Sequence, residues 1–83
     1  MTGAVYQPGR RELADRLKSL REDAEISGNQ LARRLSWVQS KVSKIETGKQ
    51  LPTEDDIRRW VGLVGGGDRL PELLFMLERA RLA

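Results

Sequence analysis

Cysteine and histidine are both missing from this chain of 83 residues. Their absence excludes disulfides, thiolate or imidazole metal ligands, and every catalytic mechanism that depends on a cysteine or a histidine. No cluster of Asp, Asn and Gly has the spacing of a calcium-binding loop, and no general base has a partner that would activate it. We therefore expect no metal ion, no cofactor and no catalytic residue, and we do not expect an enzyme.

Long apolar runs are missing as well. No stretch approaches the roughly 18–20 apolar residues of a membrane-spanning helix, so we expect no contact with a membrane and a cytoplasmic location. A chain of 83 residues is long enough for one small domain with a modest core. We place that domain at residues 10–83 and treat residues 1–9 as a flexible N-terminal tail.

The positive charge of the chain gathers in one segment. The net charge is only +3, from 15 basic and 12 acidic residues. Residues 33–50 hold five of the basic residues and one acidic residue, whereas residues 10–25 are balanced and residues 51–83 are slightly acidic. A local basic surplus is a footprint for binding a polyanion such as nucleic acid, although an ordinary solvated helix surface gives the same count.

Apolar side chains recur at helical spacing in five segments separated by turn signals, which predicts an all-α fold, a compact five-helix bundle. The first segment covers residues 10–24. The second begins at Ser27, which forms a capping-box pattern with Gln30, and the third covers about residues 38–47. The fourth follows a Thr53 cap, and the fifth begins at Asp68 or Leu70, after three glycines.

The third segment has two different faces on a helical wheel of about 100° per residue. Val38, Val42 and Ile45 form a narrow apolar stripe that would dock on the core. The outward and flanking positions hold Gln39, Ser40, Lys41, Ser43, Lys44 and Thr47. Short polar groups and lysine can enter a major groove and hydrogen-bond to base edges there. This face therefore favours a helix that reads DNA.

The segment ISGNQLARRLSWVQSKVSKIETGKQLP at residues 26–52 resembles the Cro/Xre-type helix-turn-helix domains of phage repressors and bacterial regulators. Its QSKVSKIETGK part is most similar to the N-terminal domains of actinobacterial Xre-family transcriptional regulators. The resemblance implies a lambda-repressor-like fold with its helix-turn-helix unit at about residues 27–48. It also implies sequence-specific binding of double-stranded DNA by a homodimer on a near-palindromic operator in the bacterial cytoplasm. Such regulators usually carry a C-terminal regulatory domain, so we expect this chain to be either a fragment that lacks this domain or a stand-alone DNA-binding module.

The resemblance also implies roles for individual residues. The expected base-reading residues are Gln39, Ser40, Ser43 and Lys44. The expected contacts to the DNA backbone are Ser27, Asn29, Gln30, Lys41, Thr47 and Lys49. Arg21 and Glu46 correspond to a buried ion pair that ties the first helix to the third.

The chain departs from the family pattern at four positions. Gly28 replaces a glutamine that contacts phosphate in relatives. Glu25 and Ser36 replace glycines, so each is expected to adopt a left-handed backbone. Val38 replaces the serine that usually caps the third helix, at a cost of about 1 kcal/mol, but is expected to widen the apolar stripe.

Two questions stay open at the level of sequence. Trp37 can pack over the turn or lie against DNA, and the first is favoured. Phe75, Met76 and Leu82 are expected to be partly exposed, which leaves an alternative function as an antitoxin-like or partner-binding module whose main role is protein interaction.

Overall fold

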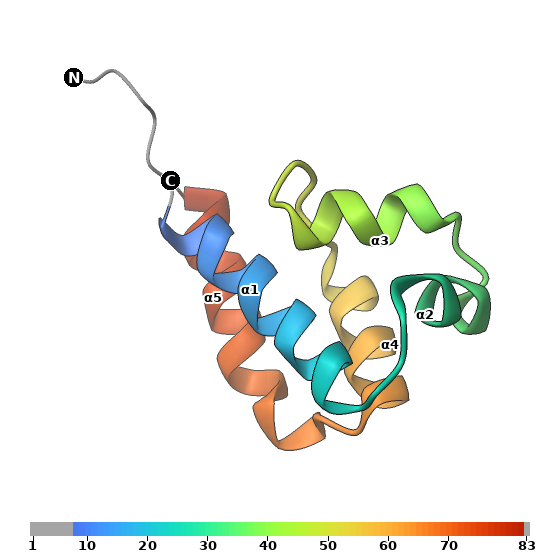
Figure 1. Cartoon of the computed structure of the whole chain (residues 1–83). Helices are drawn as coiled ribbons and strands as arrows, with labels where there is room; N and C mark the ends of the chain where they lie inside the picture. Colours follow the sequence, from blue (N-terminus) through green and yellow to red (C-terminus); the bar gives the residue numbers. More distant parts are fainter. Residues whose placement is uncertain (1–7, 83) are drawn as a thin grey trace.

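The computed structural model describes residues 8–82, and this part of the chain folds into five α-helices and one 3₁₀ turn (Figure 1). The helices are α1 (Pro8–Asp23), α2 (Gly28–Leu35), α3 (Gln39–Glu46), α4 (Glu54–Val64) and α5 (Leu70–Leu82), and the 3₁₀ turn η1 covers Gly67–Arg69. No strand occurs between residues 8 and 82, so the predicted all-α five-helix fold is confirmed. Helices α1 and α5 lie side by side, α4 lies to the right of α1 and below α3 in the view of Figure 1, and α3 lies at the opposite end of the molecule from η1.

Helix α1 begins at Pro8, two residues before the predicted start. Proline is well suited to the first position of a helix, because its fixed φ is already helical and its missing N–H has no intrahelical partner there. Gly9 continues the helix close to α5, where an added Cβ would lie 3.4 Å from the Ala80 Cα. Pro8 and Gly9 therefore belong to the folded domain, and the rest of the predicted tail, residues 1–7, lies outside the described residues.

The core forms where α1, α4 and α5 meet and continues under α2 and α3. Trp60 is fully buried, and its indole Nε1 donates a hydrogen bond to the carbonyl oxygen of Leu17 at 3.1 Å. The other large side chains with less than 2% exposure are Leu13, Leu17, Leu31, Val42, Ile45, Ile57, Leu73 and Leu77. Among the described residues, no helix is long and apolar enough to cross a membrane.

Two expectations about apolar side chains are wrong. Met76 is only 6% exposed and belongs to the core, whereas Phe75 and Leu82 are 63% and 79% exposed, as expected. Val38 does not extend the apolar stripe of α3, because it is 70% exposed. The reason is that Val38 is the N-cap of α3, with an extended backbone (φ −74°, ψ 147°), so the angles of a helical wheel do not apply to it.

Left-handed backbone occurs at the two positions where the family pattern has glycine and this chain has another residue. Glu25 has φ 60° and Ser36 has φ 62°. Both residues follow a helix, and Ser36 is the C-cap of α2, where its amide donates to carbonyl groups in the last turn. This conformation costs a non-glycine residue about 1–2 kcal/mol, so the fold keeps its tight turns at a local cost that the sequence predicts.

Candidate nucleic-acid interface

Helix α3 docks on the core through two side chains and leaves most of its surface exposed. Val42 and Ile45 are each 1% exposed. The side chains expected to read bases are all exposed and make no side-chain hydrogen bond within residues 8–82: Gln39, Ser40, Ser43 and Lys44. The structure therefore brings the four onto one short helix, with their polar groups available to a ligand.

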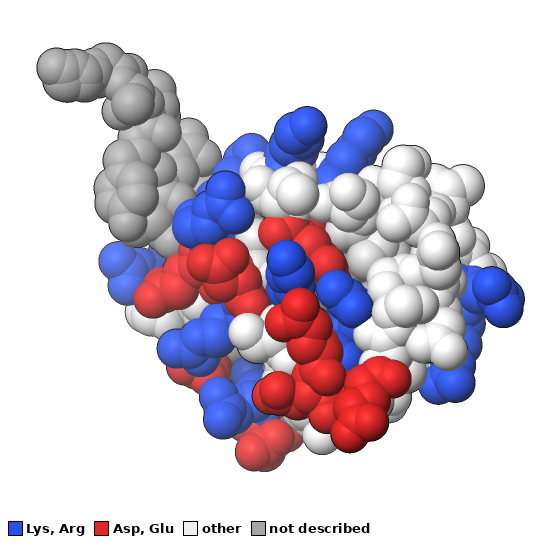
Figure 2. All heavy atoms as spheres, in the orientation of Figure 1, with Lys and Arg blue, Asp and Glu red and all other residues white. Residues whose placement is uncertain are grey.

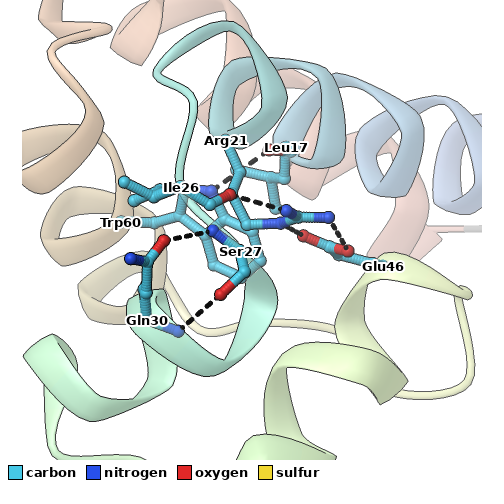
Figure 3. A network of polar contacts seen from close by, with 7 residues as sticks. All are labelled: Leu17, Arg21, Ile26, Ser27, Gln30, Glu46 and Trp60. Atoms are coloured by element: carbon cyan, nitrogen blue, oxygen red, sulfur yellow. Dashed lines mark hydrogen bonds and ion pairs between the residues drawn. The ribbon is translucent and has the colours of Figure 1, made fainter.

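A bidentate ion pair between Arg21 and Glu46 fixes the position of α3 against α1 (Figure 3). Arg21 Nε lies 2.6 Å from Glu46 Oε2, and Arg21 Nη2 lies 3.0 Å from Glu46 Oε1. The side chains of Arg21 and Glu46 are only 12% and 9% exposed, respectively. The remaining guanidinium nitrogen, Nη1, donates to the carbonyl oxygen of Ile26 at 2.8 Å. Arg21 thereby joins α1, the loop before α2, and the end of α3.

The hydrogen bond to Glu46 raises the pKa of Arg21. Burial has a smaller effect that lowers the pKa, so the net shift is upward. An arginine pKa that rises further above neutrality keeps the guanidinium charged throughout the ordinary pH range. Its contribution to stability would be lost only as the pH rises through that raised value. The ion pair is therefore a permanent structural element and not a switch.

The start of α2 lies beside α3 and is organised by a capping box (Figure 3). Ser27 Oγ accepts a hydrogen bond from the Gln30 amide at 3.1 Å, and Gln30 Oε1 accepts one from the Ser27 amide at 2.7 Å. Both side chains therefore have a structural task besides the expected contact with the DNA backbone. Asn29 is exposed between them, and the first N–H groups of a helix lack intrahelical partners and carry partial positive charge.

Lys41 is expected to contact the DNA backbone, but in the structure its ammonium group contacts other residues of the protein. Its Nζ lies 3.1 Å from Asp56 Oδ1 and 4.1 Å from the centre of the Trp37 ring. Lys49 is exposed just beyond α3. Thr47 is also exposed, although its hydroxyl donates to the carbonyl oxygen of Ser43 at 2.9 Å. Lys41 is thus set apart from the other expected backbone contacts by a buried partner.

Trp37 packs over the turn between α2 and α3. Its ring lies 6.1 Å from that of Trp60, centre to centre, at a tilt of 56°. The side chain is half-buried against the core. This position explains why an aromatic residue follows a left-handed turn residue: it seals the core at the point where the chain reverses.

A groove of about 270 Å³ runs between α1, the first turn of α2, and α3. Gly28 lies in it together with Gln39, Ser43 and Thr47, and α1 contributes Lys18. Sequence reasoning missed Lys18 as a possible backbone contact. The signal that finds it is spacing, because Lys18 precedes Arg21 by three residues and therefore lies on the same side of α1.

Charge is distributed unevenly over the surface (Figure 2). The surface over α2 and the outer side of α3 is largely uncharged, with lysine and arginine at its edges, while acidic side chains gather over α1 and toward η1. Phosphate would meet basic side chains around a neutral centre on the α2–α3 surface. The basic surplus of residues 33–50 is thus displayed around α3.

Val38→Thr is expected to raise the free energy of unfolding by about 1 kcal/mol. Val38 caps α3 without any side-chain hydrogen bond, and a threonine of nearly the same shape would supply an oxygen for an amide of the first turn. Thermal and denaturant unfolding measure the change. Val38→Ala is the control, because it also reduces the exposed apolar surface but cannot cap; an equal gain in both variants would contradict the capping explanation.

A short helix pair with an exposed second helix, braced by three others, defines a helix-turn-helix module. Residues 12–73 match the family model described as a helix-turn-helix domain, and the chain belongs to this family. The match is consistent with the Cro/Xre type that the sequence resembles. Membership indicates DNA binding and a role in transcription regulation. Comparisons with curated proteins and with solved structures find no match.

Proposed function

We propose that this protein binds a specific sequence of double-stranded DNA as a transcriptional regulator, with α3 in the major groove. The observation that carries the proposal is the outward face of α3, where Gln39, Ser40, Ser43 and Lys44 are exposed. Amide, hydroxyl and ammonium groups can hydrogen-bond to base edges, and the pattern of donors and acceptors in the major groove distinguishes all four base pairs. Residues near the start of α3 enter deepest in such complexes.

The phosphate backbone is contacted on both sides of α3 in this proposal. Asn29 and the first turn of α2 lie on one side, where free amides and the helix dipole favour an anion. Lys49 lies beyond the other end of α3. Lys18 of α1 lines the groove between α1, the first turn of α2, and α3. Ser27 and Gln30 can donate from their hydroxyl and amide groups without giving up the hydrogen bonds of the capping box. The Thr47 hydroxyl would have to release the Ser43 carbonyl to donate to a phosphate.

Two copies of the chain are expected to bind one operator. Helix-turn-helix proteins bind as two-fold dimers whose recognition helices enter successive major grooves about 34 Å apart. Two-fold symmetry of the protein then requires two inverted half-sites, so the operator is near-palindromic. The family resemblance supports this arrangement, and α3 alone is too short to read more than one half-site.

Selection of bound sequences from random double-stranded DNA tests the proposal. The expected result is a pair of inverted half-sites with centres about one helical turn apart. Binding to the selected DNA should weaken with salt, with a log–log slope of about −0.9 for each phosphate contacted. Lys49→Gln should make this slope shallower, whereas Arg69→Gln in η1 should not. Recovery of no preferred sequence would contradict specific recognition.

A second function as a partner-binding module is favoured by one observation, the exposed apolar side chains of α5. Phe75 and Leu82 are 63% and 79% exposed, more than the other large apolar residues between 8 and 82 except Val38. An antitoxin-like protein would use such a surface to hold another protein. Absence of DNA binding at any salt concentration, together with tight capture of one protein partner, would favour this function over the first.

A further inference from the structure

Lys41 is held by two groups at once. Its Nζ lies 3.1 Å from Asp56 Oδ1 and 4.1 Å from the centre of the Trp37 ring. The side chain is only 29% exposed, whereas Lys44 and Lys49, on the same segment, are exposed. A carboxylate and an aromatic face both attract an ammonium group, and partial burial strengthens each attraction. Lys41 therefore has partners that a surface lysine lacks.

Lys41 in turn supplies the cation that neutralises the Asp56 carboxylate. Asp56 is a largely buried carboxylate, since the residue is 7% exposed and its side chain 10% exposed. Its Oδ2 accepts a hydrogen bond from the Thr53 amide at 3.0 Å, in the capping box of α4, so Oδ1 remains for Lys41. A buried carboxylate without a cation is strongly disfavoured. Withdrawal of Lys41 would leave such a carboxylate.

The same face of α4 supports the turn of the helix-turn-helix unit. Asp56, Arg59 and Trp60 follow the i, i+3, i+4 spacing of one helix face. Arg59 Nη2 donates to the carbonyl oxygen of Leu35 at 2.7 Å, near the end of α2, and its guanidinium carbon lies 5.8 Å from the Trp37 ring centre. Trp60 packs against Trp37. Lys41 thus completes a set of contacts between α4 and the α2–α3 turn.

From this geometry we infer that Asp56 withholds Lys41 from the DNA backbone. Lys41 is a positioning residue, which couples the first turn of α3 to α4, and it does not neutralise phosphate. The inference rests on the proposed DNA-binding function and changes one part of it, because the sequence pattern had placed Lys41 among the backbone contacts. Asp56, which the sequence marks only as an acidic residue in the first turn after the Thr53 cap, then limits the number of phosphates that each copy of the protein neutralises.

Salt titrations of binding to the selected operator test this inference, because each neutralised phosphate changes the log–log slope by about 0.9. Lys41→Met keeps most of the side-chain length and removes the charge, and it is expected to leave the slope unchanged. Lys49→Met is the matched control and is expected to reduce the slope by about 0.9 per bound copy. A Lys41→Met slope that falls as far as that of Lys49→Met would overturn the inference.

The opposite change is expected when the carboxylate is removed. Asp56→Asn keeps an oxygen for the capping box but frees Lys41, so the slope should steepen by about 0.9 per copy. The double variant Asp56→Asn/Lys41→Met should return to the wild-type slope. An unchanged slope in a folded Asp56→Asn protein would contradict withholding. If Lys41→Met, which leaves the Asp56 carboxylate unpaired, does not fold, the Asp56→Asn slope decides.

A measurement without DNA separates this inference from the proposed function. The effects of Lys41→Met and Asp56→Asn on the unfolding equilibrium constant should be non-additive by at least about fivefold, because the two side chains contact each other. Additive effects would overturn the pairing itself. A wild-type chain that binds no DNA would overturn the proposed function, whereas normal DNA binding with a shallower Lys41→Met slope would overturn only the assignment of Lys41.

Discussion

Glu46→Ala is expected to lower the free energy of unfolding by about 3–5 kcal/mol. The substitution leaves the Arg21 guanidinium, at 12% side-chain exposure, without the carboxylate that meets it at 2.6 Å and 3.0 Å. A buried charge that loses its partner costs more than the pair contributed, since its desolvation is no longer compensated. Native domains of this size are stable by only about 5–15 kcal/mol, so chemical denaturation measured by circular dichroism should show a large shift of the midpoint.

Two further variants separate the buried pair from a general effect of removing a glutamate. Glu12→Ala changes an exposed residue of α1 and should alter stability by less than about 0.5 kcal/mol. The double variant Arg21→Met/Glu46→Leu removes both charges and should recover a large part of the loss, because no buried charge is then left alone. A loss below about 1 kcal/mol in Glu46→Ala would show that Arg21 finds solvent or another partner.

The helices of this protein were predictable because their signals are local. Ser27 with Gln30, and Thr53 at the start of α4, mark helix starts by hydrogen bonds within three residues, and both caps form in the structure. The left-handed turns at Glu25 and Ser36 were predictable for a different reason. They follow from the family pattern, in which glycine usually occupies these places, so that the backbone keeps its shape when the residue changes.

In helix α5 the periodic pattern of apolar residues does not identify the buried face correctly. In the sequence alone, the spacing of the leucines favours an inner face of Leu70, Leu73, Leu74 and Leu77. In the structure the buried positions are Leu73, Met76, Leu77 and Ala80, and both Leu70 and Leu74 are only half-buried. Six of its first eight residues are large and apolar, so several stripes fit the sequence equally well. Packing against α1 and α4 decides between them, and this information is not local.

The candidate site likewise has a part that the sequence predicts and a part that depends on packing between helices. The outward face of α3 could be predicted, because Ser40, Ser43 and Lys44 lie away from Val42 and Ile45 on any regular helix. The environment of Lys41 could not, since Asp56 is 15 residues away in the chain and belongs to another helix. Lys18 differs, because its three-residue spacing from Arg21 is a local signal that places it on the same side of α1. Side chains at the flanks of a helix meet neighbours that the helix itself does not specify.

Lys44→Ala is expected to weaken binding to the selected operator by about 1–3 kcal/mol and to relax the preference at one base pair. Lys44 is exposed on the outward face of α3, opposite the side chains that dock on the core. Its ammonium group is therefore available to an acceptor such as guanine O6 or N7. Binding measured on a set of operators, each changed at one position, should show the loss of discrimination directly.

Comparison with Lys49→Ala distinguishes base reading from simple attraction to phosphate. A phosphate contact is the same on every sequence, so Lys49→Ala should weaken binding to the operator and to random DNA by similar factors. Lys44→Ala should weaken operator binding more than random binding, because only the operator offers the matching base edge. Equal losses on both kinds of DNA would move Lys44 to the backbone contacts and leave Gln39, Ser40 and Ser43 as the readers. In that case a hydrogen-bonding face without any charge would account for the specificity of α3.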